Sequence, residues 1–543
     1  MFGFKNSMKM KNKIALLIAL ISVLMITSCN DIITDNPESK INQVGFYNSQ
    51  ISIQYGVMGC YSGMQQIIID EWKFTENRTD NSCVANTGTG TTRRVDYCDI
   101  RFFRTPPSQP LLLGFWRNYF TNIMNVNAVL PAVAKGQTII PSETLRAQYE
   151  GELLFIRAYH YFSLVNLWGD MFKVTSVLDK DQAKTLKRLP VDSIYAEVIM
   201  PDLKKAAAQL PSIYAYNDLG RVTKWAAEGM LAKAYITRHG TNDLDSALVL
   251  INDIITNSPH GLLTTGALVV GKQLTPYASI FDITNEMNKE IIFAVRFKGG
   301  TSGIGSPFWS NFAPDGSPTG LFLNVGTPGG DNNATPNDLL PKFYADTTAG
   351  IPNVRFHQSV IWYGKKASSM IGAPGKWIDP TIQQVNQGEN DWIVLRFADL
   401  LLLRAEILAQ GTTPDNARAD VNSIRARAGV TQYTTAFTSN TDALDKVYLE
   451  RRLEFAFENI RWFDLLRMNK SYGDPEKAIT ILKYEMTNAN SLDFYNIYSK
   501  YKPIIPPSPE YFITSKLLLP IPQQEIDTYN SGNSLTLTQN AGY

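Results

Sequence analysis

The sequence WIVLRFADLLLLRAEILAQG, at residues 392–411, and the stretch TPDNARADVNSIRARAG, at 413–429, together decide the fold class of this chain. The first stretch predicts a helix that ends at Gly411. The second begins with Thr-Pro-Asp, in which Thr413 caps a helix, Pro takes its first position and Asp lies in its first turn. The second helix buries small and aliphatic side chains, namely Ala417, Val421, Ile424 and Ala428. So short a connection forces the two helices into an antiparallel hairpin.

Two further stretches predict long helices with small or apolar contact faces. Residues 142–168 run from a possible cap, Ser142, to a stop at Gly169, with apolar side chains recurring every three or four positions. Residues 221–240 place several alanines on one face, which lets another helix approach closely. Helix pairs with alanine at their contact are the units of helical solenoids such as tetratricopeptide repeats, although this chain has no strict repeat period. We therefore expect a mainly α fold built on a tetratricopeptide-like scaffold of helix pairs.

Between the helices lie long segments rich in Gly, Pro, Asn and Thr, near residues 72–114 and 299–392. Connections of this length are uncommon in compact domains and are usually functional. The runs EIIFAVRF, at 290–297, and KLLLPIP, at 516–522, predict short strands. These segments predict an irregular, loop-rich part that binds ligand beside the helical scaffold.

The N-terminus carries the features of an export signal. Four lysines precede an uncharged, largely apolar run from Ile14 to Ser28, and this run is shorter than the roughly 20 apolar residues that span a bilayer. The next residues, ITSC at 26–29, resemble the lipobox of bacterial lipoproteins, whose cysteine receives the lipid. We expect residues 1–28 to be removed and Cys29 to be the point of lipid attachment, which leaves 29–543 as one domain anchored by its N-terminus.

Charge and metal-ligand counts exclude several classes of function. The chain has 51 basic and 50 acidic side chains, so it lacks the basic footprint of a nucleic-acid-binding protein. The four histidines, at 160, 239, 260 and 357, do not have the spacing of a helical zinc site. We expect no metal or cofactor, apart from a possible calcium ion at Asp331 in the loop GTPGGDNN. Cys83 and Cys98 could form a disulfide, and free buried thiols are the alternative.

The best candidate for catalysis is a row of three glutamates in LERRLEFAFENIRWFD. Glu450, Glu454 and Glu458 lie at i, i+4 and i+8, and two carboxylates about 5 Å apart would suit a retaining glycosidase. Arginines and apolar residues surround them, however, and buried carboxylates need cationic partners. We expect these residues to form a structural lattice of ion pairs. The chain also lacks a G-x-S-x-G elbow and a phosphate-binding G-x-x-x-x-G-K motif, so we expect no enzymatic activity.

Aromatic and polar side chains in the loops predict a sugar-binding site. A sugar ring offers an apolar face and a rim of hydroxyl groups, which flat aromatic rings and Asn, Asp or Arg side chains can match. The candidate ligand contacts form two patches with one further tyrosine, namely Trp72, Arg78, Asp80, Asn81, Phe308, Trp309, Asn311 and Tyr363.

Several motifs together resemble one family. They are LLFIRAYHYFSLVNLWGD, GRVTKWAAEGMLAKAYI, VNSIRARAG, LERRLEFAFENIRWFDLLR, LLPIPQQEI and the final LTQNAGY. In this order they resemble SusD-like (RagB/SusD) outer-membrane lipoproteins, with Ala541 where the family has proline. The resemblance implies a SusD-like domain of helix pairs with a ligand-binding loop region. It also places Trp72, Arg78, Asp80 and Asn81 in a stretch that often contacts ligand.

The resemblance also implies a function and a partner. A SusD-like protein is a lipid-anchored, non-catalytic protein on the outer membrane that captures oligosaccharide for a SusC-like TonB-dependent transporter. Arg93, Arg94, Arg101 and Arg104 lie in the first loop, where they could bind peptide carboxylates, so capture of oligopeptides is the alternative. A surface glycoside hydrolase is less favoured.

Overall fold

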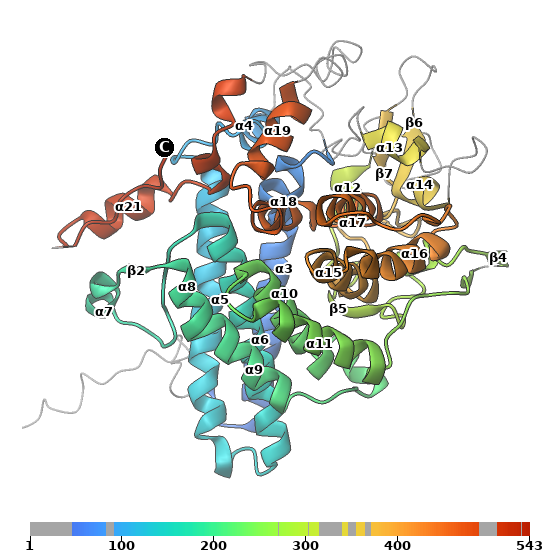
Figure 1. The fold of residues 1–543 in the computed structure, drawn as a ribbon. Helices are drawn as coiled ribbons and strands as arrows, with labels where there is room; N and C mark the ends of the chain where they lie inside the picture. Colours follow the sequence, from blue (N-terminus) through green and yellow to red (C-terminus); the bar gives the residue numbers. More distant parts are fainter. Residues whose placement is uncertain are drawn as a thin grey trace, which may run out of the picture. The chain divides into compact units, whose positions relative to one another are not determined.

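Long helices form most of the structure, and short strands connect a few of their ends (Figure 1). The computed structural model describes residues 46–82, 92–269, 271–301, 303–313, 339–345, 354–363, 371–487, 508–533 and 535–543. The chain divides into two units, Met1–Ser52 and Ile53–Tyr543, and the following description concerns the second.

The first half of this unit is a succession of packed helices. They are α3 (Gln50–Phe74), α4 (Thr92–Arg101), α5 (Pro110–Ala134), α6 (Glu143–Trp168), α7 (Lys180–Thr185), α8 (Val191–Ile194), α9 (Met200–Gln209), α10 (Lys224–Arg238) and α11 (Asp243–Asn257). Consecutive long helices pack against each other, α5 on α6, α6 on α9, and α10 on both α9 and α11. The predicted caps of α6 are confirmed, because Ser142 Oγ accepts from the Leu145 N–H at 3.2 Å and Gly169 ends the helix at φ 78°.

The second half repeats the helix-pair arrangement. Its helices are α12 (Phe308–Phe312), α13 (Leu339–Ala345), α14 (Val354–Ser359), α15 (Phe397–Ala409), α16 (Ala417–Arg427), α17 (Asn440–Glu454), α18 (Arg461–Ser471), α19 (Lys477–Thr487) and α21 (Gln523–Asn530). The predicted hairpin is present, with α15 packed against α16 and α17. The mainly α fold with helix pairs is thus confirmed.

The start of the predicted hairpin differs from the expectation. Residues Trp392–Arg396 form strand β8 rather than the first turns of a helix, and β8 pairs antiparallel with β5 (Ile291–Val295). Thr413 precedes a 3₁₀ turn at Pro414–Asn416, and its side chain forms no capping hydrogen bond. The β-branched and aromatic residues of β8 favour the strand once a partner strand is available.

The other strands are short antiparallel pairs. They are β1 (Met171–Phe172) with β2 (Arg188–Leu189), β3 (Leu268–Val269) with β4 (Lys272–Gln273), and β6 (Val360–Tyr363) with β7 (Ile371–Pro374). The run at 516–522, which the sequence analysis predicted as a strand, forms no strand. Pro520 and Pro522 cannot donate to a ladder, and the segment packs instead through Leu519 N, which donates to Leu167 O at 2.7 Å.

Candidate functional site

The first predicted ligand patch is buried. The Trp72 side chain has no exposed surface and packs edge-on against Tyr97 and Phe312, with ring centroids 5.6 and 5.2 Å away. The Arg78 guanidinium lies between the rings of Phe103 and Trp462, 4.6 and 4.1 Å from their centroids. Both side chains fill the interior, and neither presents a face to a ligand.

The polar residues of this patch are bound to the helices α17 and α18. Asp80 accepts two hydrogen bonds of 2.8 Å from Arg461, and Asn81 Oδ1 accepts from Arg452 Nε at 3.0 Å. Burial alone would raise the pKa of Asp80, but Arg452 and Arg461 outweigh it and hold the pKa well below its usual range. Asp80 and Asn81 therefore join two distant parts of the chain.

The second predicted patch is also mainly interior. Phe308 and Trp309 have no exposed surface, and the Phe308 ring packs against Trp392 at 4.3 Å between centroids. Asn311 is half-buried, and the side chain of Tyr363 lies outside the described part of the chain. The two patches do meet, through the contact of Trp72 with Phe312 in α12, but they meet inside the protein.

Burial corrects the prediction of direct ligand contact for six of the eight candidate residues. These are Trp72, Arg78, Asp80, Asn81, Phe308 and Trp309, which are at most 2 % exposed. A side chain with no exposed surface cannot touch a sugar without leaving its packing partners. For Asn311 and Tyr363, contact with the ligand stays a prediction.

The predicted lattice of ion pairs is confirmed beneath these patches. Glu454 pairs with Arg396 at 2.7 Å and with Arg355 at 3.3 Å, and Glu458 pairs with Arg396 at 2.8 Å and with Lys376 at 2.5 Å. Glu450 pairs with Arg355 at 2.5 Å. All three carboxylates are buried, so the geometry opposes their acting as a glycosidase pair on an external substrate.

The lattice shifts the pKa values of its members. Burial would raise the pKa of Glu454, but the guanidinium groups of Arg427, Arg396 and Arg355 outweigh this effect and lower the pKa to about 2. Burial lowers the pKa of Lys376 to about 8, against the attraction of Glu458. Glu454 is thus held ionised as a structural anion.

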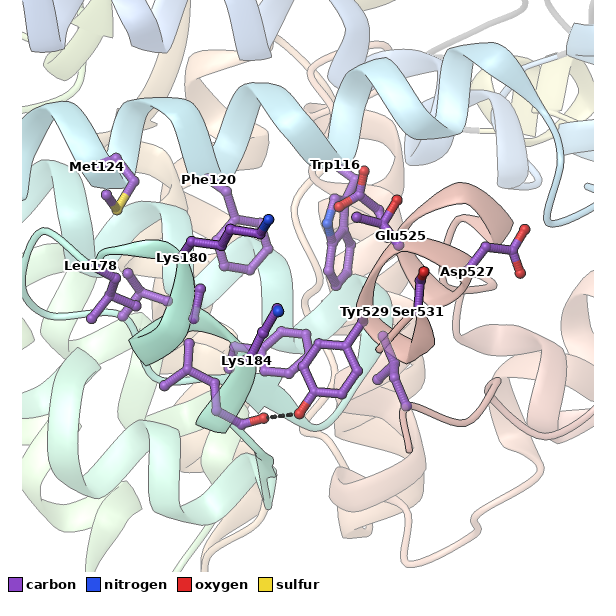
Figure 2. A pocket seen from close by; sticks show the side chains of 16 residues that line it. Trp116, Phe120, Met124, Leu178, Lys180, Lys184, Glu525, Asp527, Tyr529 and Ser531 are labelled. Carbon is purple, nitrogen blue, oxygen red and sulfur yellow. Dashed lines mark hydrogen bonds between the residues drawn. The ribbon is translucent and has the colours of Figure 1, made fainter. Parts of the chain in front are cut away.

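A groove that was not predicted from the sequence lies between three segments that are far apart along the chain. We call it the α5–α21 groove; it has a volume of about 820 Å³ and is lined from segments 116–124, 172–186 and 525–537 (Figure 2). Trp116, Phe120 and Met124 line one wall from α5 at positions i, i+4 and i+8. That spacing was the available sequence signal, since it places an apolar row on one helix face.

The opposite walls of the groove carry rings and charges. Phe172 and Tyr529 are half-buried, and their ring centroids lie 5.8 Å apart. Lys180 and Lys184 come from α7, and Glu525 and Asp527 come from α21 (Figure 2). The groove therefore combines apolar ring faces with a polar, charged rim, which is the usual composition of a small-ligand site.

The predictions of a calcium site and of a disulfide both involve residues outside the described ranges. Within the described ranges, no three His, Cys, Asp or Glu side chains are grouped as metal ligands, and Asp331 lies outside those ranges. Cys60 is a free buried thiol whose pKa burial raises to about 12. Cys83 is not among the described residues, so its pairing with Cys98 stays a prediction. Among the helices that are described, none has the length and apolar character needed to cross a bilayer.

The chain is similar to known proteins over most of its length. The family model described as "SusD family" matches residues 321–543, and the one described as "Starch-binding associating with outer membrane" matches 35–236. SusD-like protein P25 of Formosa agariphila is 26% identical over 499 residues, which cover 85% of this chain and 90% of that protein.

Solved structures share the fold. A SusD-like protein of Bacteroides fragilis superposes with a TM-score of 0.69 at 22% identity, covering 92% of this chain and 98% of that chain. Surface glycan-binding protein A of Bacteroides thetaiotaomicron, in complex with laminarihexaose, superposes with a TM-score of 0.69 at 19% identity, covering 91% and 99% of the two chains. Sequence motifs, helix-pair architecture and these matches agree that the chain is a member of the SusD-like family.

Proposed function

We propose that this protein captures oligosaccharides at the cell surface and passes them, uncleaved, to a SusC-like TonB-dependent transporter. The observation that carries the proposal is the fold shared with surface glycan-binding protein A, whose structure holds laminarihexaose. The description "Starch-binding associating with outer membrane" for the family model over residues 35–236 supports the same role.

The proposed location is the outer face of the outer membrane, with Cys29 as the lipid-bearing residue. The lipobox-like sequence at 26–29 supports this anchor. Two or more acyl chains are enough for stable attachment. The proposed role needs no cofactor, and a calcium ion at Asp331 remains a separate prediction.

Burial of the glutamate row supports capture rather than cleavage. Glu450, Glu454 and Glu458 are engaged by cations inside the protein, and a glycosidase needs its two carboxylates on either side of an accessible bond. A surface hydrolase is therefore less favoured than a carrier. Oligopeptide capture stays the alternative for the same fold.

Calorimetry of the purified protein against a panel of neutral and acidic oligosaccharides and mixed oligopeptides tests the proposal. We expect saturable binding of at least one oligosaccharide, with a Kd in the millimolar to micromolar range, because a few ring contacts must offset the cost of association. Chromatography of the same sugar after long incubation should recover it at its original chain length. Binding of peptides alone would favour the alternative, and enzyme-like shortening of the sugar would contradict the proposal.

A further inference from the structure

The α5–α21 groove has the size of a ligand site, and hydrogen bonds fix its walls in place. Its volume of about 820 Å³ lies within the range of about 300–1,000 Å³ typical of ligand pockets. Its walls are fastened to one another, because Tyr529 Oη donates to Leu186 O and Asn533 Nδ2 donates to Lys184 O at 2.7 Å. These two bonds hold the α7 segment against the segment that contains α21, so the groove is formed before any ligand arrives.

Half-buried rings give the groove the faces that a sugar ring needs. Phe120 packs on Trp116 with centroids 5.0 Å apart, and Phe172 packs on Tyr529. The Tyr529 hydroxyl is already used by Leu186, so its ring remains the available part. Flat rings match the C–H faces of sugars, and the lining thus supplies two ring platforms.

The cations on the α7 side of the groove are not neutralised by carboxylates of the described residues. Lys180 and Lys184 lie one turn apart on α7, and neither forms an ion pair with any carboxylate of the described residues. Figure 2 shows Lys180 and Lys184 on the α7 side of the groove, whereas Asp527 comes from α21 on the opposite side. Glu525 is paired with Arg117 at 2.7 Å. The α7 wall therefore offers two free cations to a ligand.

A second cavity provides a contrast. It has a volume of about 510 Å³ beside α3 and β5, and its lining includes Arg221, Arg296 and Lys298. Each of these cations is already paired, Arg221 with Glu152 at 2.7 Å, and Arg296 and Lys298 with Glu286 and Glu389 at 3.0 Å. The second cavity thus has no comparable charge to offer.

We propose that the α5–α21 groove binds an oligosaccharide that carries anionic groups, with its sugar faces on Phe120 and the Phe172–Tyr529 pair and its anions on Lys180 and Lys184. The shared chemistry is an anionic sugar, whose charge comes either from a uronic acid carboxylate or from a sulfate ester. This inference rests on the proposed function and names the class of glycan that the protein takes.

The test measures the affinity of the purified protein for three probes by calorimetry, at low and at high ionic strength. The probes are oligogalacturonides, which carry carboxylates, sulfated galactan oligosaccharides, and neutral laminari-oligosaccharides. The wild type should bind one of the two anionic probes more tightly than the neutral one, and this affinity should fall with salt because exposed charge interactions are screened. The anionic probe that binds identifies the source of the charge.

Two variants and two matched controls locate the binding. The double variant Lys180→Gln/Lys184→Gln should weaken binding of the anionic probe about tenfold or more and remove most of its salt dependence. Phe120→Ala should weaken binding about fivefold or more through the lost ring face. The controls are Lys187→Gln, an exposed lysine next to α7 that does not line the groove, and Tyr484→Ala, an aromatic on α19 that is 68% exposed. Both should bind like wild type, and thermal melts should confirm that all variants fold.

The failures of the inference and of the proposed function are distinguishable. If the wild type binds only neutral sugars, or if the lysine and Phe120 variants bind anionic sugar like wild type, the groove inference is overturned and glycan capture stands. If the wild type binds no sugar of any class, the proposed function itself is overturned.

Discussion

At the scale of single residues, Arg396 is the side chain on which the buried lattice depends most. It pairs with Glu290, Glu454 and Glu458 at 3.1, 2.7 and 2.8 Å, and it has no exposed surface. Replacing it with Met would leave carboxylates buried without enough cations. We expect Arg396→Met to lower the free energy of unfolding by about 3–5 kcal/mol, measured by urea unfolding.

The matched control for this prediction is Arg418→Met. Arg418 pairs with Asp415 at 2.7 Å, but both side chains are about one-third exposed. Water and salt screen such a pair, so its loss should leave the urea midpoint nearly unchanged. Equal effects of the two substitutions would show that the buried lattice carries no special share of stability.

Residue identity predicted the lattice better than it predicted the ligand contacts. The glutamate row occurs among apolar residues with arginines nearby, so its burial and pairing could be inferred locally. The fate of Arg78 and Asp80 could not, because the segments that cover and bind them lie far along the chain, at Trp462, Arg461 and Arg452. An aromatic or charged loop residue looks the same in sequence whether a distant helix covers it or not.

At the scale of an element, replacing two different glycines of α3 with alanine should have opposite effects on stability. A Cβ added at Gly63 would lie 2.1 Å from Asn122 Oδ1 on α5, and Asn122 is buried with its Nδ2 donating to Cys60 O at 2.9 Å. We expect Gly63→Ala to destabilise the protein by about 1–3 kcal/mol, because it forces α3 and α5 apart.

Gly59→Ala, one turn earlier on the same helix, should stabilise the protein. No atom lies within 4 Å of a Cβ at this exposed position, and alanine is about 0.5–1 kcal/mol better than glycine inside a helix. Thermal unfolding of the two variants beside wild type measures the difference. A destabilised Gly59→Ala variant would contradict this account of the α3 surface.

Secondary structure was predicted correctly where the local sequence pattern determines it. It was predicted wrongly where a partner far along the chain determines it. The caps of α6 follow from Ser142 and Gly169 alone. Residues 392–396 became strand β8 because β5, about a hundred residues earlier, was there to pair with it. The α5–α21 groove escaped prediction for a related reason, since each wall comes from a different part of the chain and only the α5 wall has a readable pattern.

At the scale of the whole molecule, the proposed anchor gives a direct prediction. Cys29→Ser removes the thiol that would carry the lipid, so the variant should incorporate no labelled palmitate and should leave the membrane fraction. Ser28→Ala keeps a small residue before the cysteine and is expected to be lipidated like wild type. Membrane fractionation with palmitate labelling measures both. Retention of label by Cys29→Ser would place the lipid elsewhere.

The lattice also fixes the base of the hairpin β6–β7 from both sides. Arg355, ahead of β6, binds Glu450 at 2.5 Å, and Lys376, just after β7, binds Glu458 at 2.5 Å and Glu454 O at 2.8 Å. Both ends of the hairpin are thus bound to α17 and to the loop that follows it. The sequence between Arg355 and Lys376 can therefore change during evolution while these ion pairs are kept. Such a division would let the hairpin vary among related proteins while its attachment to the helices stays the same.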